Sequence, residues 1–488
     1  MFCKFLTVVP AIAMAVSPAG CSSPFDGFTN GLDSNTRLIE QSIAREWKRD
    51  TTDPRNQGFS TVESLESPDA PATTSQPDDS STLDDFLIIA ALNNPQLEAA
   101  FANWKAALER LPQVRSLPDP RFTYGVFINE VETRVGPQQH RIAVAQMFPW
   151  FGKLDLKEGI ASKLADAAYE AYQSVKLDVF QGVRDAYYQR AGLEREIQVT
   201  RENIELIRQL ERTARARLRV ATAKHPDVIR LQIELEKLSD HLLSLEDMRH
   251  PINAKLNAAL NRDSSESLSG SFELPRERLG ASDQEVLKAL RQNNPKLKAL
   301  DHQMESGRLA TRLAKLAERP DVTIGLDYIV TDEALNPSIN ESGDDPLVAS
   351  FSINLPIWHE KYEAGVREAI ARRYAIVREK KNLDNTLTSR IQTTLYEYRD
   401  AQRQISLYRD TLLPKAMQSL ESTLVSYQTG ESSFLDLLEA QRDLLAFELV
   451  LIRGQTSRAR ELARLDQIAG IRLARVNDES PQHEMNTQ

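Results

Sequence analysis

Three acidic residues towards the end of the chain form its clearest chemical pattern. Asp436, Glu439 and Asp443 are spaced at i, i+3 and i+7, so a helix would place them on one face, just after a turn at Gly430. Carboxylates that crowd together attract cations, repel anions and raise one another's pKa. The plainer alternative is a solvated acidic face near a helix N-terminus, where acidic side chains are favoured. The residues alone leave both interpretations open.

Catalytic motifs are absent from the sequence. It contains no glycine-rich phosphate loop, no Cys-x-x-Cys and no His-Glu-x-x-His. The histidines are scattered without metal-ligand spacing; they are His140, His225, His241, His250, His302, His359 and His483. We therefore expect a protein that is not an enzyme and that binds neither a cofactor nor a metal ion.

The composition favours long exposed helices over compact cores. Of the 488 residues, 41% are apolar and 27% are charged, and the charges of both signs are mixed along the chain. The net charge of −10 argues against nucleic acid as a partner.

The N-terminus has the pattern of a secretory signal. Lys4 precedes an apolar run, 5–16, that is too short to span a bilayer. The small residues that follow end at Cys21 and are similar to a bacterial lipobox, although Pro18 stands where such boxes usually hold leucine. We expect residues 1–20 to be a signal peptide and Cys21 to be acylated; ordinary cleavage after Ala19 is the alternative.

The remaining chain reads as a linker followed by two copies of one unit. Residues 21–82 are predicted to be a lipid-anchored segment and linker, since their second half is rich in Ser, Thr, Pro and Asp. The block Asn93-Asn94-Pro95-x-Leu97 returns 200 residues later as Asn293-Asn294-Pro295-x-Leu297. We predict repeats at 83–270 and 281–472, each in the order helix, strands, long helix, helix, and a C-terminal tail at 473–488.

Each repeat contains two strand candidates with alternating polarity. They span about 121–131 and 138–148 in the first repeat and about 320–331 and 346–356 in the second. Each has the length of a tilted membrane strand. Four aromatic residues at strand ends, Phe148, Trp150, Phe151 and Trp358, fit an interfacial girdle. A four-stranded soluble sandwich is the alternative, but four strands make little core in such a helical chain.

The helices after the strands are very long. Residues 153–223 contain no proline and carry an apolar stripe, which predicts a helix of about 100 Å. The matching helix, 362–427, contains Pro414, which should kink it. The helices predicted at 83–117 and 226–260 would match one long helix if stacked end to end.

Four strands cannot close a barrel, and strands that face lipid cannot leave open edges. Three copies of the chain would supply twelve strands and a roomy lumen. The predicted fold class is therefore mainly α with membrane β: a trimeric 12-stranded β-barrel at one end of a wall of long helices.

The order and spacing of these motifs resemble the TolC-type outer-membrane factor family, in its heavy-metal and multidrug efflux branch. The resemblance covers roughly 83–472. It rests on the paired Asn-Pro-x-Leu blocks, on residues 146–153 (Gln-Met-Phe-Pro-Trp-Phe-Gly-Lys), on Tyr427-x-x-Gly430 and on residues 436–441 (Asp-Leu-Leu-Glu-Ala-Gln). It implies a homotrimeric channel in the outer membrane of a Gram-negative bacterium, in which a shared 12-stranded β-barrel is continued by a long α-helical barrel in the periplasm.

The resemblance also implies a function and partners. A family member is the exit duct of a tripartite efflux system, works with a periplasmic adaptor and an inner-membrane RND-type pump, and conducts substrates such as metal cations or drugs. The sequence leaves open a channel for type I protein secretion and, less favourably, a periplasmic coiled-coil adaptor. An adaptor would need its β segments at the chain ends, whereas here the strands are central in each repeat.

Two kinds of site residue are carried over from the family. Asp436 and Glu439 match its periplasmic aspartate constriction, and with Asp443 they would line the pore. Asp227 and Tyr427 match residues of the lock that keeps the entrance closed. Ser432 departs from the pattern, because the best-known member has the lock's arginine there.

Overall fold

Residues 77, 80–219, 224–336, 338 and 340–477 are described by the computed structural model of the chain. All of them belong to one unit, Thr73–Gln488. The predicted signal peptide, Cys21 and most of the predicted linker lie outside the described residues, so these remain predictions.

The first half of this unit contains a pair of helices, a strand hairpin, a 67-residue helix and a second pair of helices. These elements are α2 (Leu83–Asn93), α3 (Pro95–Arg115), β1 (Arg121–Thr133), β2 (Gly136–Phe148), α4 (Lys153–Arg219), α5 (His225–Asp247) and α6 (Arg249–Ala259).

The second half has a similar order of elements, with short strands at its two ends. These elements are β3 (Glu277–Leu279), α7 (Asp283–Asn293), α8 (Pro295–Leu316), β4 (Val322–Thr331), β5 (Leu347–Ile353), α9 (His359–Leu407), the π-helical turn η3 (Tyr408–Leu412), α10 (Leu413–Thr429), α11 (Phe434–Ala469) and β6 (Arg475–Asn477).

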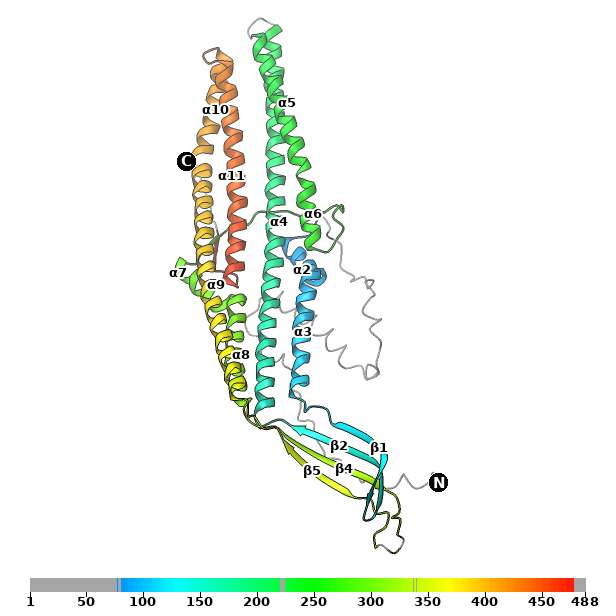
Figure 1. Cartoon of the computed structure of the whole chain (residues 1–488). Coiled ribbons are helices and arrows are strands. Elements are labelled where there is room, and N and C mark those ends of the chain that lie inside the picture. Colours follow the sequence, from blue (N-terminus) through cyan, green and yellow to red (C-terminus); the bar gives the residue numbers. More distant parts are fainter. Residues whose placement is uncertain (1–76, 78–79, 220–223, 337, 339, 478–488) are drawn as a thin grey trace. The chain divides into compact units, whose positions relative to one another are not determined.

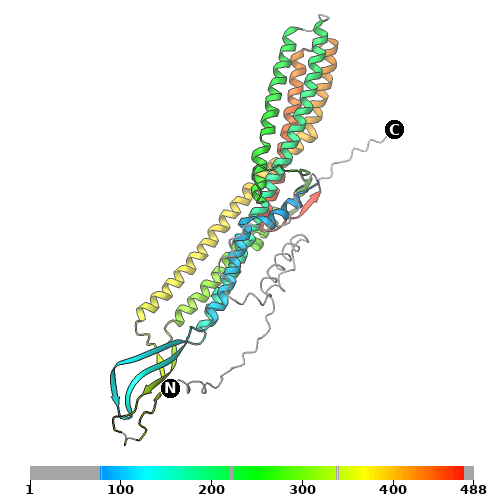
Figure 2. The ribbon, with the colours of Figure 1, turned by 90° about the vertical axis from the view of Figure 1, so that its right-hand side faces the viewer.

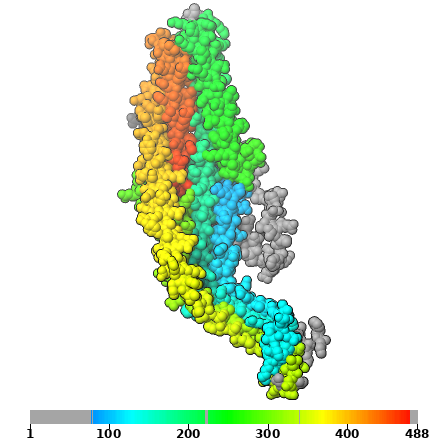
Figure 3. Space-filling model, in the orientation of Figure 1, coloured from blue at the N-terminus to red at the C-terminus, as the bar shows by residue number. Residues whose placement is uncertain are grey.

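The helices pack side by side along α4. Near the strands, α4 contacts α3 and α8, and α8 contacts α9; towards the other end, α4 lies between α5 and α11, and α11 contacts α10. Figure 2 shows these four helices together at the end opposite the strands. The predicted apolar stripe of α4 is buried there, with Ile197, Ile204 and Ile207 at most 4% exposed. In the space-filling view, α9 and α10 run along α11 in yellow and orange (Figure 3).

The helix predicted at 83–117 is interrupted at Asn94, because that residue caps a new helix. The Asn94 Oδ1 atom accepts hydrogen bonds from the N–H groups of Gln96 and Leu97, at 3.0 and 3.2 Å, and Pro95 occupies the first helical position. The Asn94 Nδ2 atom donates to the carbonyl oxygen of Ala259, at 2.9 Å. The start of α3 therefore meets the end of α6, as the predicted end-to-end stacking requires.

Asn294 does the same in the second half. Its Oδ1 atom accepts from the N–H of Leu297 at 3.2 Å, and its Nδ2 atom donates to the carbonyl oxygen of Ile468 at 2.8 Å. The repeated Asn-Pro block thus joins the beginning of α8 to the end of α11.

Two further interruptions occur at prolines. The helix predicted at 226–260 divides into α5 and α6, and Pro251 lies four residues after Asp247, the last residue of α5. A proline ring clashes with the carbonyl group four residues earlier. Likewise, Pro414 lies four residues after Asp410, and the π-helical turn η3 replaces the simple kink expected there.

The four long strands form one antiparallel sheet at one end of the helices, in the order β1-β2-β4-β5 (Figure 1). The first three strands have bounds close to the predicted ones. The fourth, β5, is shorter than the predicted 346–356. Pro346 and Pro356 flank it and have no N–H group to extend the ladder.

The beginning of the predicted tail, 473–488, is not free. Residues 475–477 form β6, which pairs with β3 in an antiparallel register that places Val476 opposite Arg278. This pairing is between segments almost 200 residues apart, so local sequence patterns do not reveal it.

Candidate functional site

The turn between α10 and α11 lies at the end of the helices farthest from the strands. Helix α10 ends at Gly430, whose φ of 87° is in the left-handed region that favours glycine. The N–H of Glu431 donates to the carbonyl oxygen of Ser426 at 2.8 Å, which closes the turn. Ser433 then caps the N-terminus of α11.

Asp436 is part of that cap. The Ser433 N–H donates to the Asp436 carboxylate at 2.9 Å, and the Asp436 N–H donates to the Ser433 hydroxyl at 3.3 Å. Hydrogen bonds from the side chain and backbone of Ser433 lower the pKa of the exposed Asp436 carboxyl. Within one chain this cap keeps Asp436 ionised at neutral pH; the increase in pKa expected where carboxylates crowd concerns rings formed by several chains and stays a prediction.

Glu439 and Asp443 continue the exposed face that begins at Asp436. Arg442, beside them on α11, donates to the Glu234 carboxylate of α5 at 3.1 Å and makes a second, shorter bond to it. The hydrogen bond to Glu234 raises the pKa of Arg442, and the Glu439 charge adds to the increase. The positive charge is thus held towards α5, and the carboxylates are left facing solvent.

The two residues assigned to an entrance lock have different partners. Asp227, in the first turn of α5, pairs with Arg230 of the same helix at 3.6 Å. The Tyr427 ring on α10 packs edge-on against Phe434 of α11, with 6.0 Å between the ring centroids. Ser432, at the family's arginine position, donates its hydroxyl to the carbonyl oxygen of Thr423 at 3.3 Å.

Arg217 is a further residue of this end that the sequence analysis missed. It lies in the last turn of α4, and its guanidinium carbon is 4.9 Å from the Tyr427 ring centroid. Its Nη1 and Nη2 atoms donate to the carbonyl oxygens of Tyr427 and Gln428, at 2.9 and 2.7 Å. The end of α4 has several arginines, so nothing in the sequence singles out Arg217.

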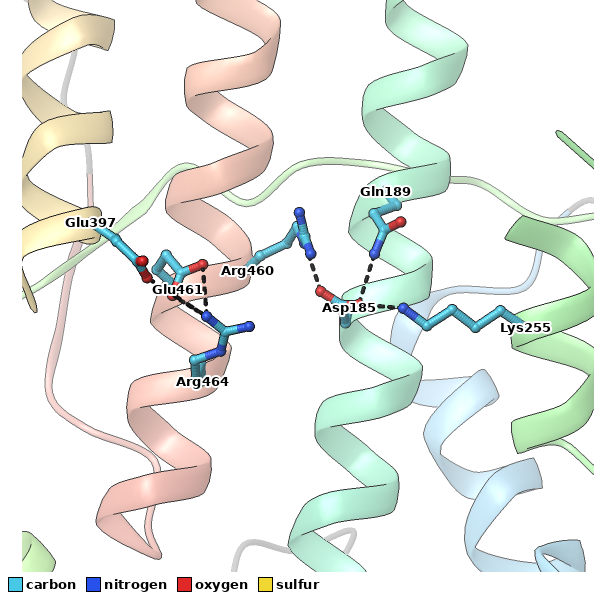
Figure 4. Close-up of polar contacts among 7 residues, drawn as sticks. All are labelled: Asp185, Gln189, Lys255, Glu397, Arg460, Glu461 and Arg464. Atoms are coloured by element: carbon cyan, nitrogen blue, oxygen red, sulfur yellow. Dashed lines mark hydrogen bonds and ion pairs between the residues drawn. The ribbon is translucent and has the colours of Figure 1, made fainter. Parts of the chain in front are cut away.

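A polar layer crosses the helices about half-way along α4. Asp185 of α4 accepts from Lys255 of α6 at 2.5 Å, from Arg460 of α11 at 2.6 Å and from Gln189 at 2.7 Å (Figure 4). Burial alone would raise the pKa of Asp185, but the hydrogen bonds from Lys255 and Arg460 outweigh it and lower the pKa. Asp185 therefore ties three helices together as an ionised group.

Glu461, which directly follows Arg460 on α11, is held differently. It is buried beside Glu397 of α9, and Arg464 lies 3.1 Å from its carboxylate (Figure 4). Burial raises the pKa of Glu461; Arg464 opposes this change and Glu397 adds to it. The surroundings thus lower the pKa of Asp185 and raise the pKa of Glu461.

The four predicted interface aromatics gather where the strands meet the helices. Phe148 ends β2, the Trp150 N–H donates to Asp321 at 2.8 Å, and Phe151 and Trp358 are 90% and 70% exposed. A salt bridge of 2.8 Å between the Asp321 carboxylate and the Lys153 amine fixes this junction.

No described helix combines the length and apolarity needed to cross a membrane. Among the described residues, no group of three or more His, Cys, Asp or Glu side chains is arranged to hold a metal ion.

Comparison with known proteins identifies the family. Residues 88–262 and 286–471, most of the chain, match the outer membrane efflux protein family. The chain belongs to this family. It is therefore an outer membrane efflux protein, and its family is one of efflux proteins rather than of enzymes.

Individual relatives agree with this assignment. The cobalt-zinc-cadmium resistance protein CzcC of Cupriavidus metallidurans is 21% identical over 402 residues, which cover 80% of this chain and 90% of CzcC. Crystal structures of CusC and of VceC from Vibrio cholerae have TM-scores of 0.67 and 0.65, with 16% and 18% identity. They cover 83% and 80% of this chain, and 99% and 96% of their own chains; at such identities the likeness concerns the fold.

Proposed function

We propose that three copies of this chain form the exit duct of a tripartite efflux system. The observation that carries the proposal is the sheet of a single chain. One of its faces exposes large apolar side chains, such as Phe122 and Phe351, and β1 and β5 lie at its edges. Open strand edges are not tolerated in lipid. Pairing β5 of one copy with β1 of the next closes a 12-stranded barrel, which the helices continue as an α-helical barrel.

The two halves of the protomer derive from an internal duplication in this proposal. Its support is the similar order of elements and the equivalent hydrogen bonds of Asn94 and Asn294, each of which joins a new helix to the end of another. The repeats keep their predicted bounds, 83–270 and 281–472. The duct itself performs no chemical reaction and holds no cofactor.

The proposed cargo is a metal cation, with drugs as the second class. The similarity to a cobalt-zinc-cadmium resistance protein supports metal cations. An RND-type pump in the inner membrane would supply the energy and a periplasmic adaptor would connect the pump to the duct. A deletion strain that is no more sensitive to divalent metals than its parent would remove the preference for metal cargo.

The entrance lies at the α10–α11 turn in this proposal. In a trimer, Asp436, Glu439 and Asp443 would form stacked rings of carboxylates that concentrate cations. The cap of α11 supports this role, since hydrogen bonds from Ser433 lower the pKa of Asp436 within each chain.

The closed entrance rests on Arg217 and Tyr427. Their contact joins α4 to α10 within one protomer, at the end of the chain where the family's lock would lie. Arg217 would supply the positive charge that is missing at Ser432. Asp227, which pairs with Arg230, would support the same end of α5.

Two features would fix the duct in the membrane. Acyl chains on Cys21 would tether each protomer, and Phe148, Trp150, Phe151 and Trp358 would lie at the lipid–water boundary. Mass spectrometry of the mature N-terminus tests the first feature: a mass increase equal to lipid on Cys21 supports it, and an unmodified N-terminus contradicts it.

Purification from outer membranes in detergent tests the oligomer. We expect a trimer that dissociates on heating. A monomer recovered in the soluble fraction would contradict the proposal.

A further inference from the structure

One ion pair lies in the middle of the four-stranded sheet. The Nε atom of Arg141, on β2, donates to Oδ1 of Asp327, on β4, at 2.8 Å, and Nη2 contacts the same oxygen. Ala143 is opposite Asp327 in the register, so Arg141 and Asp327 are diagonal neighbours on one face. The Ser350 hydroxyl of β5 donates to Oδ2 at 3.4 Å. Both oxygens of Asp327 therefore have partners on adjacent strands.

The sheet is shaped around this carboxylate. Gly325 lies opposite Ser350, and a Cβ atom at position 325 would be 2.5 Å from the Ser350 hydroxyl. Glycine thus leaves the room that the hydroxyl needs beside Asp327. Asp327 is 6% exposed, whereas the Arg141 side chain is 53% exposed. The carboxylate is buried beneath the guanidinium group that it neutralises.

The pair lies on the polar face of the sheet. The opposite face carries a row of apolar residues in register, Phe122, Val144 and Leu326, each about half exposed or more. Apolar side chains of a membrane barrel face lipid and the alternate ones face the lumen. In the trimer of the proposed function, on which this inference rests, three Arg141–Asp327 pairs would therefore lie at one level of the lumen.

No other charged pair shares this level within the four described strands. Their remaining Asp, Glu, Lys and Arg residues are Arg121, at the start of β1, and Glu130 and Glu132, near its other end. The charge at mid-sheet is thus set by Arg141 and Asp327. Without Asp327, three guanidinium groups would form a positive ring that repels cations.

We propose that Asp327 determines the ion specificity of the barrel lumen, because it neutralises the ring of Arg141 side chains and so lets cations leave the duct. This specificity is separate from that of the carboxylates at the entrance. For cations to leave the duct, the barrel lumen must carry no net positive charge at the level of Arg141.

The test is the reversal potential of single channels in a planar bilayer under a potassium chloride gradient. The salt should be about 0.01–0.1 M, where the Debye length is about 30–10 Å and the field of a charged ring reaches across the lumen. All variants are compared within the Asp436→Asn/Glu439→Gln background, so that the entrance does not dominate the selectivity. Asp327→Asn leaves Arg141 uncompensated, Arg141→Gln leaves the carboxylate uncompensated, and the double variant removes both charges.

We expect Asp327→Asn to lower the cation-to-anion permeability ratio by about threefold or more. Arg141→Gln should raise the ratio, and the double variant should return close to the parent value. A merely structural ion pair would not shift the ratio in opposite directions. If Asp327→Asn fails to assemble, the other two variants still test the proposal: the permeability ratio should rise in Arg141→Gln and return to the parent value in the double variant.

Unchanged reversal potentials in conducting Asp327→Asn and Arg141→Gln channels would overturn this inference and leave the proposed function intact. An absence of conductance in the parent protein would instead overturn the proposed function, and this inference with it.

Discussion

Arg217 of α4 lies against Tyr427 of α10, with its guanidinium carbon 4.9 Å from the ring centroid and its Nη1 atom donating to the Tyr427 carbonyl oxygen at 2.9 Å. A cation at the C-terminus of a helix is favoured by the helix dipole. The contact thus connects the α4–α5 end of the protomer to the α10–α11 end. In a trimeric duct, opening the entrance would require these two ends to separate.

Replacing Arg217 with alanine should therefore open the entrance. A hydrogen bond to a charged group contributes about 1.5–3 kcal/mol, and about 1.4 kcal/mol changes an equilibrium tenfold. If the contact is lost on opening, we expect the open fraction in planar-bilayer recordings to rise about tenfold. Arg217→Lys, which keeps the charge but not the planar stacking, should have a smaller effect. An Arg217→Ala channel with the open fraction of the parent would show that the contact does not hold the entrance closed.

The acidic face of α11 should set cation selectivity at the entrance. We expect Asp436→Asn/Glu439→Gln to reduce the cation-to-anion permeability ratio and to weaken block by multivalent cations added from the periplasmic side. Amides are chosen because Asp436 also caps α11 through Ser433, and an amide oxygen still accepts that bond. Selectivity equal to that of the parent would mean that these carboxylates do not line the pore.

The Asp185 carboxylate should stabilise the folded protein at pH values above the pKa that this carboxyl has in the unfolded chain. Its folded pKa is lowered from the ordinary value of 3.8, so its contribution is fully present above pH 3.8 and is lost as the pH falls towards the folded pKa. Asp185→Asn should accordingly lower the Tm at pH 7, and the difference from the parent should narrow below pH 3.8. A difference in Tm that stays constant through this acidic range would contradict the assignment.

The contribution of Glu461 to stability should have the opposite dependence on pH. Its folded pKa is raised above 4.5, so the contribution of this group is greatest below pH 4.5 and declines as the pH rises through the folded pKa. Glu461→Gln removes this titration. We expect the Tm of the variant minus the Tm of the parent to increase as the pH rises from 4.5 to 7. A difference that stays constant or decreases over this range would refute the raised pKa.

Patterns that repeat along the chain predicted much of the fold. The alternation from Phe122 to Ile128 locates β1, because a half-buried strand alternates its side chains between two faces. The proline-free run 153–223 predicts the whole of α4, and its residues after Arg219 lie outside the described residues. The recurrence of Asn94 as Asn294 marks equivalent positions, although the sequence did not show that each caps one helix and bonds to the end of another.

What the sequence did not predict depends on contacts between distant segments. Arg217 differs from its neighbouring arginines only in the residues that pack against it. Strand β6 forms because its residues pair with β3, with Val476 opposite Arg278. The lowered pKa of Asp436 likewise follows from the geometry of its cap with Ser433 rather than from the spacing of the acidic residues.

The most direct test of the trimeric duct is conductance. Protein purified in detergent from outer membranes, run as a heat-sensitive trimer and added to a planar bilayer, should produce discrete conductance steps that favour cations. The same sample dissociated by heat should produce none. A trimer that inserts without any conductance, or a chain that purifies only as a soluble monomer, would contradict the account.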